Sequence, residues 1–234
     1  MELHILSGGA AAGVVRGIQE EFEKKYSCKI QATFNAVGQM RDDLIAGKPC
    51  DLVILTKQLI DQLIMSGHVI AGTQLSLGLV KTGVAVKSGA PVPPIKTREE
   101  LLASFINAKG IYFPDPLKAT AGIHVMHVLT QLGIAETHKE KFRTYPNGAL
   151  AMAAMAACSE DGLIGSTQVT EINITPGCDL IGLLPKEFEL ATDYTLGICV
   201  NGKNPDLAQK LATILTGPES IAIRKKIGFE VESN

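Results

Sequence analysis

The sequence contains no tryptophan, and aromatic residues make up only 5% of its 234 residues. It also has no run of about 20 apolar residues, the length that a helix needs to cross a bilayer, so we expect no membrane insertion. Lysine and arginine together number 22 and aspartate and glutamate 24, and neither sign is concentrated in one segment. Because this balance provides no basic surface for phosphate backbones, we expect no nucleic-acid partner.

Several motifs that indicate catalysis or metal binding are also missing, namely HExxH, GxSxG and GxxxxGK followed by Ser or Thr. His124 and His127 have the spacing to approach a metal from one helix face, but no nearby carboxylate completes a recognisable set of ligands. The stretch from Gly8 to Gly13 is rich in glycine without the phase of a dinucleotide-binding loop. We therefore expect no metal and no cofactor.

The five cysteines form no CxxC pair and no zinc-like spacing, so we expect small buried side chains rather than a disulfide framework. Met1 leads almost directly into a strand-like segment, without the charged and apolar stretches of a secretory leader. An odd number of thiols is more typical of a reducing compartment. Two localisations stay open at this stage: the periplasm if a leader has been removed, and the cytoplasm otherwise.

Strand-length apolar runs alternate along the chain with longer segments of helical periodicity, which predicts an α/β fold with mainly parallel sheets. A proline-rich loop ends at Pro94, and Thr97 followed by Glu100 predicts a helix that begins with a capping box. A lobe boundary is expected near residues 80 to 90. The clearest strands are predicted at residues 3–6, 29–34, 52–55, 110–113, 162–165, 180–185 and 194–200.

Turns made of small residues recur directly before predicted helices, at residues 7–12, 35–39 and 118–122. The first N–H groups of a helix have no partner within the helix, and the helix dipole adds positive potential there. Glycine and alanine allow a ligand to come close to these groups. In a parallel sheet such turns lie at the carboxyl ends of the strands, so together they predict a site for an anion.

Blocks of sequence along nearly the whole chain are similar to molybdate-binding proteins of ABC transporters. They are residues 6–10, 46–55, 115–116 with 120–124, 146–151, 161–168, 217–219 and 228–229. The resemblance implies a divergent member of that family with the two-lobed type II periplasmic-binding-protein fold, each lobe a mainly parallel sheet flanked by helices. Two hinge crossovers would join lobe 1 (residues 1–83 and 194–234) to lobe 2 (84–193). A monomer that closes its cleft on a small anion and delivers it to a permease is then expected.

The sequence departs from that family where the ligand would be held. The resemblance places serine hydroxyls in the first two turns, but here those positions hold Ala10 with Ala11 and Ala36 to Gly38. Each missing hydrogen bond to a buried anion costs about 1–3 kcal/mol, which disfavours molybdate itself. We expect a polycarboxylate as the preferred ligand, with Arg41 as a two-pronged partner or as an ordinary exposed helix residue.

Two functions therefore stay open: a solute-binding protein for an oxyanion or polycarboxylate, and an isomerase similar to the aconitate isomerases that resemble this family. An isomerase would need a base next to a carboxylate-bearing carbon, for which His124 and Tyr112 are candidates alongside Glu171 and Asp115. Asp115 between two prolines is also typical of a residue that fixes a turn. Two further turns, at residues 146–149 and 166–168, are expected to help set specificity. The residues predicted to bind ligand are Ser7, Gly8, Gly9, Ala10, Val37, Gly38, Gln39, Arg41, Thr120, Ala121, Asn147, Gly148, Ser166 and Gln168, with the hydroxyl of Tyr194 as an addition.

Overall fold

The computed structural model describes residues 1–231, and contacts between residues divide the chain into two units. Unit 1 consists of Met1–Val80 together with Thr192–Asn234, and unit 2 is Lys81–Ala191. The chain passes from unit 1 to unit 2 within strand β4 (Leu75–Lys87) and returns at the start of strand β9 (Ala191–Ile198). The two crossovers predicted from the sequence are therefore present.

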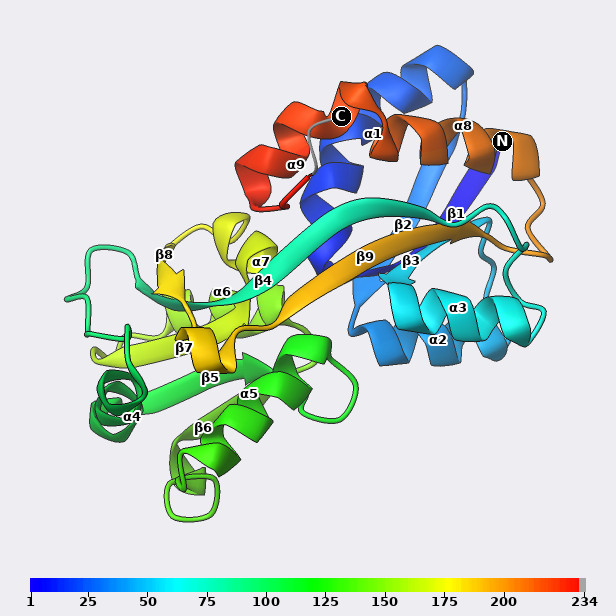
Figure 1. Cartoon of the computed structure of the whole chain (residues 1–234). Helices are drawn as coiled ribbons and strands as arrows, with labels where there is room; N and C mark the ends of the chain where they lie inside the picture. Colours follow the sequence, from blue (N-terminus) through cyan, green and yellow to red (C-terminus); the bar gives the residue numbers. More distant parts are fainter. Residues whose placement is uncertain (232–234) are drawn as a thin grey trace. The chain divides into compact units, whose positions relative to one another are not determined.

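The sheet of unit 1 has the strand order β2-β1-β3-β9-β4. Strand β1 (Glu2–Gly8) pairs in parallel with β2 (Lys29–Asn35) and with β3 (Leu52–Thr56), and β9 runs antiparallel to β3. Helices cover both faces (Figure 1). One face carries α1 (Ala12–Tyr26), α8 (Pro205–Thr216) and α9 (Ile221–Ile227), and the other carries α2 (Val37–Ile45) and α3 (Lys57–Met65).

Strand β3 lies at the centre of unit 1, as its uninterrupted apolar sequence predicts. Residues Leu52 to Leu55 have no exposed surface, because helices pack on both faces of the strand. Asp51, directly before the strand, is also buried, and its carboxylate accepts hydrogen bonds from the N–H groups of His4 and Asn204, each at 2.8 Å. This carboxylate therefore joins the first strand and the start of α8 to the central strand.

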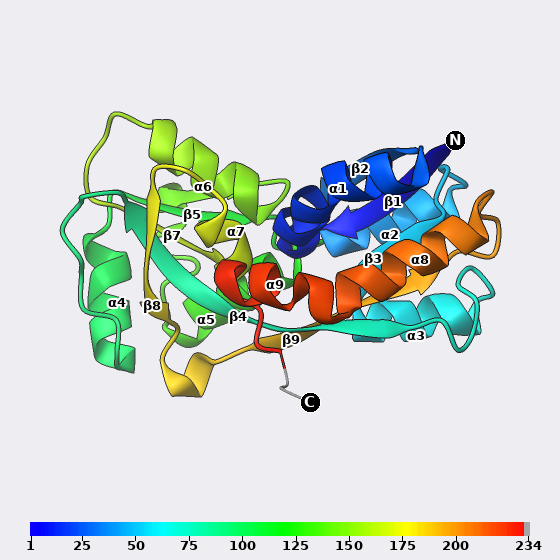
Figure 2. The same ribbon diagram turned by 90° about the horizontal axis from the view of Figure 1, so that it is seen from above.

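The sheet of unit 2 has the order β4-β7-β5-β6, and β8 also pairs with β4. Strands β5 (Gly110–Pro114), β6 (Phe142–Tyr145) and β7 (Leu163–Gln168) are parallel to one another, whereas β4 runs antiparallel to β7 and to β8 (Cys178–Leu183). Four helices flank this sheet (Figure 2). They are α4 (Arg98–Asn107), α5 (Thr120–Gln131), α6 (Gly148–Ala157) and the short α7 (Val169–Asn173).

Alternation along β5 creates two cores, one on each face of this sheet. Ile111 and Phe113 pack with the apolar side chains of α4 and α5, whereas Tyr112 points to the other face and packs with α6 and α7. The helix expected from the Thr97 and Glu100 pair begins there, and both hydrogen bonds of the capping box are present. One expectation was wrong: residues 166–168 are not a turn but the buried end of β7, because pairing with β4 continues to Gln168.

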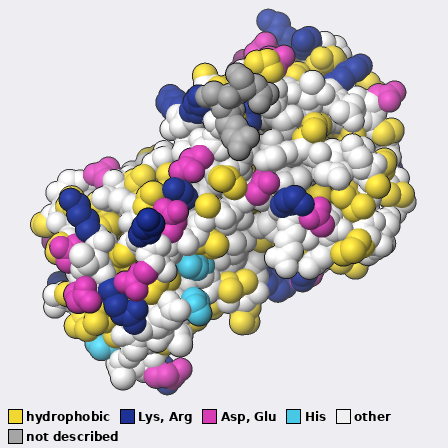
Figure 3. Space-filling view, in the orientation of Figure 1, with side chains coloured by type: hydrophobic (Ala, Val, Ile, Leu, Met, Phe, Trp, Pro, Cys, Tyr) yellow, Lys and Arg dark blue, Asp and Glu magenta, His cyan; other side chains and the backbone are white. Residues whose placement is uncertain are grey.

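Charged side chains on the protein surface show the even mixture of signs that the sequence predicts. On the face shown in Figure 3, basic and acidic side chains are interspersed.

Within residues 1–231, we find no helix with the length and apolar character needed to cross a membrane. All five cysteines are free thiols, of which Cys28, Cys50 and Cys199 are buried.

Candidate functional site

Two of the predicted small-residue turns lie next to each other at one edge of the unit 1 sheet. Strands β1 and β2 are parallel and pair through Gly8 and Asn35, so both end at the same edge. After β1 the chain enters a short 3₁₀ helix (Gly9–Ala11) that leads into α1, and after β2 it enters α2. The sequence prediction that these turns share an edge is therefore consistent with the strand register.

The helix starts at this edge have no side-chain caps. Gly8 precedes the 3₁₀ helix and Ala36 precedes α2, and neither side chain accepts a hydrogen bond from the helix that follows. By contrast, the next helix along the chain, α3, is capped by the hydroxyl of Thr56, which accepts from the N–H of Leu59. The cap residues Gly8 and Ala36 therefore supply no side-chain acceptor to the N–H groups of the first turns, which lie in a region of positive helix potential.

Gly8 is required for the close packing of the two turns. A β-carbon at this position would lie 2.7 Å from Cγ1 of Val37 and 3.2 Å from Cε1 of Tyr194, which is closer than packed atoms allow. Tyr194 reaches this edge because it pairs with Thr56 across β9 and β3. Its ring is buried and meets Phe229 edge to face. Glycine at position 8 thus brings the start of α2, the first turn and the Tyr194 ring together.

The polar side chains predicted at this edge already have partners within unit 1. The hydroxyl of Ser7 is fully buried and donates to the carbonyl oxygen of Gly8 at 2.9 Å. Arg41 is partly exposed and donates to one carboxylate oxygen of Asp42 from both Nε and Nη2, at 3.0 and 2.6 Å. Gln39 donates to Asp43 at 2.9 Å. The donors that the edge presents are therefore those of the main chain.

In unit 2 the corresponding edge is formed by the ends of the parallel strands β5, β6 and β7. The carboxylate of Asp115 accepts from the N–H groups of Leu117 (2.7 Å) and Lys118 (3.2 Å), which fixes the turn after β5 as its position between prolines predicts. Helix α5 then begins at Thr120 behind Ala119, whose side chain cannot cap it. The first turn of α5, including the buried Ala121, is thus a third uncapped helix start.

The fourth predicted turn, before α6, is occupied by groups of unit 2 itself. The side chain of Asn147 accepts from the N–H of Leu150, and the N–H of Gly148 donates to Oε1 of Glu171 at 3.2 Å. A β-carbon at position 148 would lie 2.0 Å from Oγ1 of Thr167 and 2.1 Å from the Glu171 carboxylate, so only glycine fits. At the start of α6, the carboxyl group of Glu171 therefore accepts an N–H group that an external anion could accept at an uncapped helix start.

Glu171 is a residue whose structural role the sequence did not reveal. Its carboxylate accepts a 2.7 Å hydrogen bond from Thr167, and main-chain bonds from Gly148 and Ala149 also favour the charged form. Burial is the larger influence and raises the pKa of Glu171 above its usual range. Because the acid binds its proton more tightly when folded, its contribution to stability is present at low pH and is lost as the pH rises through the folded pKa.

We expect this linkage to appear in the pH dependence of unfolding. As the pH rises above about 4.5, the free energy of unfolding of the Glu171→Gln variant should fall less than that of the wild type, because glutamine cannot ionise. Urea unfolding at several pH values measures the difference. The exposed Glu99 provides a matched control, since Glu99→Gln should leave the profile unchanged. Parallel profiles for wild type and Glu171→Gln would contradict the assignment.

At the end of β7, one polar side chain has a hydrogen-bond partner and another has none within residues 1–231. Ser166 is fully buried, and its hydroxyl donates to the carbonyl oxygen of Gly83 at 2.9 Å. Gln168 is only 1% exposed, yet within residues 1–231 neither its amide nitrogen nor its amide oxygen has a hydrogen-bond partner. A buried amide without partners is unusual, so Gln168 is the side chain of this edge that most requires an external group.

The two candidate catalytic side chains both have structural partners in unit 2. Nε2 of His124 donates to the carbonyl oxygen of Phe188 at 2.7 Å, and burial lowers the pKa of this imidazole. Tyr112 is packed in the core, with its ring stacked on Tyr145 at 6.0 Å between centroids. Burial raises the pKa of Tyr112 to about 12. Both side chains are therefore held by contacts within unit 2.

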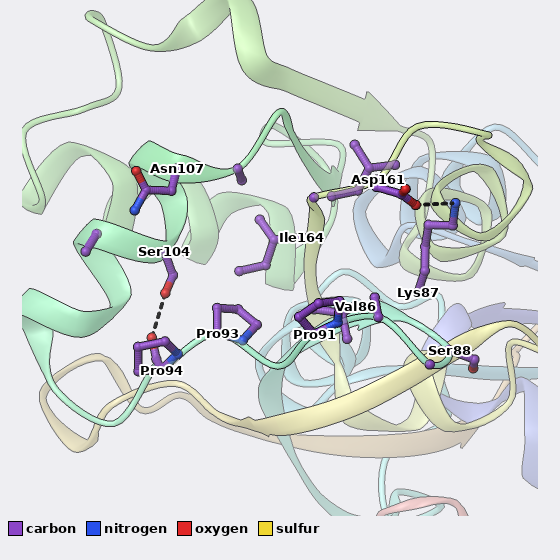
Figure 4. A pocket seen from close by; sticks show the side chains of 16 residues that line it. Val86, Lys87, Ser88, Pro91, Pro93, Pro94, Ser104, Asn107, Asp161 and Ile164 are labelled. Atoms are coloured by element: carbon purple, nitrogen blue, oxygen red, sulfur yellow. Dashed lines mark hydrogen bonds and ion pairs between the residues drawn. The ribbon is translucent and has the colours of Figure 1, made fainter.

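Unit 2 also has a cavity of about 800 Å³ at the opposite edge of its sheet (Figure 4). Its walls include the last residues of β4 and the first residue of β7, whereas Gln168 is the last residue of β7. Several of its polar groups are engaged: Lys87 donates to the carbonyl oxygen of Cys158 at 2.6 Å and lies 4.0 Å from Asp161, and Ser104 donates to Pro94. None of the predicted ligand-binding residues lines this cavity.

In the part of the chain that the structure describes, no cluster of three or more His, Cys, Asp or Glu side chains could hold a metal.

Known proteins similar to this chain include an aconitate isomerase and molybdate-binding proteins. Aconitate isomerase of a Pseudomonas species is 25% identical over 93% of this chain and 83% of its own length. The molybdate-binding protein ModA of Escherichia coli K12 is 22% identical over 99% of this chain and 90% of its own. The structure of the periplasmic molybdate-binding protein of Azotobacter vinelandii matches with a TM-score of 0.83 at 17% identity, covering 99% of this chain and 100% of that one.

These similarities confirm both the resemblance inferred from the sequence blocks and the predicted type II periplasmic-binding-protein fold. They also extend along nearly the whole chain rather than over one segment. The sequence model for bacterial extracellular solute-binding proteins matches residues 3–230. The chain therefore belongs to the family of bacterial extracellular solute-binding proteins.

Proposed function

We propose that this protein binds a small anion as the solute-binding component of an ABC transporter. The observation that carries the proposal is the set of uncapped helix starts at the carboxyl edges of the sheets, after β1 and β2 in unit 1 and before α5 in unit 2. Main-chain N–H groups at such positions bind anions without any charged side chain. Relatives that are named as molybdate-binding proteins support this assignment.

In unit 1 the N–H groups that we assign to an anion are those of Gly9, Ala10, Val37 and Gly38, and in unit 2 they are those of Thr120 and Ala121. Arg41 belongs to the same edge, and moving its guanidinium from Asp42 to a ligand carboxylate would exchange one charged acceptor for another. The hydroxyl of Ser7 already donates to Gly8, and no other residue of the first two turns carries a hydroxyl. A carboxylate-bearing ligand fits this donor set better than a compact tetrahedral dianion, which needs a donor for each oxygen.

The partner that follows from this function is the permease of an ABC transporter, and the place of action is outside the cytoplasmic membrane. The family description, extracellular solute binding, supports both statements. We propose that the protein acts as a monomer that binds one anion.

A panel of anions tests the proposed function. Purified protein is heated alone and with millimolar molybdate, tungstate, sulfate, phosphate, citrate or either aconitate isomer. A ligand present at about 1,000 times its dissociation constant stabilises the folded state by about 4 kcal/mol, which raises Tm by about 5–15 °C for a chain of this size. We expect the largest shift with a polycarboxylate. If no anion shifts Tm beyond the effect of an equal concentration of chloride, the proposal is wrong.

The enzymatic alternative rests on the similarity to aconitate isomerase. An isomerase must hold a base beside the carbon that loses its proton, but His124 binds Phe188 and Tyr112 lies in the core. The other two candidates also have partners within unit 2: Glu171 accepts from Gly148 and Thr167, and Asp115 accepts from Leu117 and Lys118. We therefore propose binding in preference to catalysis. Incubating the protein with trans-aconitate and separating the two isomers by chromatography distinguishes the functions, and formation of the cis isomer above the rate in buffer would favour the enzyme.

A further inference from the structure

Three buried side chains of unit 2 have polar atoms that lack a hydrogen-bond partner within residues 1–231. They are the hydroxyl oxygens of Thr82 and Thr170 and both amide atoms of Gln168, and the three residues are 2%, 0% and 1% exposed. Native interiors pair nearly all such atoms, because an unpaired polar group loses its hydrogen bonds to water without replacement. Within residues 1–231 the one other buried side-chain atom without a partner is the hydroxyl oxygen of Thr192 in unit 1. The unpaired atoms of unit 2 are therefore suited to bind an external group.

The strand register places two of these side chains together. Thr82 in β4 is the direct partner of Gln168 in β7, and opposed residues of an antiparallel pair point to the same face of the sheet. Thr170 follows two residues later in α7. Gln168 ends β7 at the carboxyl edge of the unit 2 sheet, the edge at which α5 begins after β5. The unpaired atoms thus belong to the edge that we assign to the anion.

The chemistry of the amide restricts what can satisfy it. The amide nitrogen of Gln168 donates two hydrogen bonds, which a carboxylate accepts, but the amide oxygen only accepts. A fully ionised oxyanion or carboxylate carries no donor, so it would leave this oxygen unpaired. A ligand with an O–H group next to its carboxylate satisfies both ends of the amide, and the hydroxyls of Thr82 and Thr170 can rotate to either role.

We propose that Gln168 is a specificity-determining residue that selects a hydroxycarboxylate, by pairing its amide oxygen with the ligand hydroxyl and its amide nitrogen with a carboxylate oxygen. This inference rests on the proposed function, because it names the class of anion for the same site. Sites built to bond a substrate hydroxyl discriminate strongly against analogues without it, since the buried partner is then left unpaired.

Matched ligand pairs measure this selection directly. Citrate is compared with tricarballylate, and malate with succinate, since each pair differs by one hydroxyl. Calorimetric titration should show the hydroxylated member binding at least about 10-fold tighter, which is the lower part of the range for a buried polar group left unpaired. In the Gln168→Met variant, the preference should shrink to about 2-fold or less, because the near-isosteric side chain pairs with neither ligand.

The same variant provides a readout that a structural role would not give. Without ligand, Gln168→Met should raise Tm by a few degrees, because it replaces an unpaired buried amide with an apolar side chain of similar shape. Gln19→Met is the matched control: the Gln19 amide donates to Glu23 and to the carbonyl oxygen of Ile30, so its loss should lower Tm. A fall in Tm for Gln168→Met would show that the amide stabilises the protein internally and would overturn the proposal.

The possible results distinguish the role proposed for Gln168 from the anion-binding function on which it rests. Equal affinity for both members of each pair would overturn the inference while leaving anion binding intact. Tight binding of hydrogen phosphate, which also carries a donor, with no binding of hydroxycarboxylates would overturn the ligand class. Absence of binding for every anion would overturn the inference together with the proposed function.

Discussion

Replacing Arg224 with methionine is expected to lower the free energy of unfolding by about 2–4 kcal/mol, and with it Tm by about 5–15 °C. Arg224 lies in α9 and is only 2% exposed. Its guanidinium donates to the carbonyl oxygens of Leu77 and Thr216 at 2.8 Å and of Gly217 at 3.0 Å, and its Nε donates to the Ser220 hydroxyl at 2.9 Å. Methionine keeps the apolar part of the side chain but removes all four donors.

The cost is large because the acceptors around Arg224 include the end of a helix. Thr216 is the last residue of α8 and Gly217 follows it, so their carbonyl oxygens carry the negative end of the helix dipole. Leu77 belongs to β4, one of the two crossover strands. Burial lowers the pKa of Arg224, because desolvation opposes its charge. Without the four acceptors the buried guanidinium would have no hydrogen bonds to replace those it loses to water.

Two comparison variants make the result specific to the network. Arg224→Lys keeps the charge but presents one ammonium instead of a planar fork, so we expect a Tm between those of wild type and Arg224→Met. Lys226→Met removes a positive charge from an exposed position of the same helix, and its free energy of unfolding should lie within about 0.5 kcal/mol of wild type. Urea unfolding followed by circular dichroism measures all four proteins. An unfolding midpoint for Arg224→Met that equals that of Lys226→Met would contradict the prediction.

The parts of the fold that the sequence predicts correctly are those specified by local patterns. Four apolar residues in a row from Leu52 predict a strand buried on both faces, and Thr97 with Glu100 predicts a helix start, because each signal lies within one turn or one strand. The turns before α1 and α2 are also local, since a short strand, small residues and a periodic segment follow one another. Parallel pairing then places their ends at one edge without further information.

The contacts that the sequence does not reveal join residues far apart in the chain. The bond from Gly148 to Glu171 spans 23 positions, and the bond from Arg224 to Leu77 spans 147. No spacing predicts either contact. Residues 166–168 show the same limit: serine is common in turns, but tertiary pairing with β4 extends the strand through these residues. The unpaired state of Gln168 is likewise visible only when its surroundings are known.

The second large effect is expected from Ala36→Asp, which should weaken binding of the preferred anion at least about 100-fold without unfolding the protein. Ala36 is the N-cap of α2, with extended backbone angles (φ −55°, ψ 138°) that suit a capping aspartate. The introduced carboxylate would accept the N–H groups of the first turn that we assign to the ligand. It would also place a negative charge beside a second one, and like charges at an interface cost several kcal/mol.

Stability and affinity should move in different directions in this variant. A new N-cap contributes about 0.5–2 kcal/mol to a helix, so we expect the unliganded protein to be at least as stable as wild type. Structural damage would instead lower both quantities. Thr97→Asp supplies a matched control, because it adds the same charge at the N-cap of α4, which is already capped, and should leave affinity unchanged. Titration of the panel anion that shifts Tm most measures the effect, and an affinity of Ala36→Asp within 3-fold of wild type would show that the start of α2 does not hold the ligand.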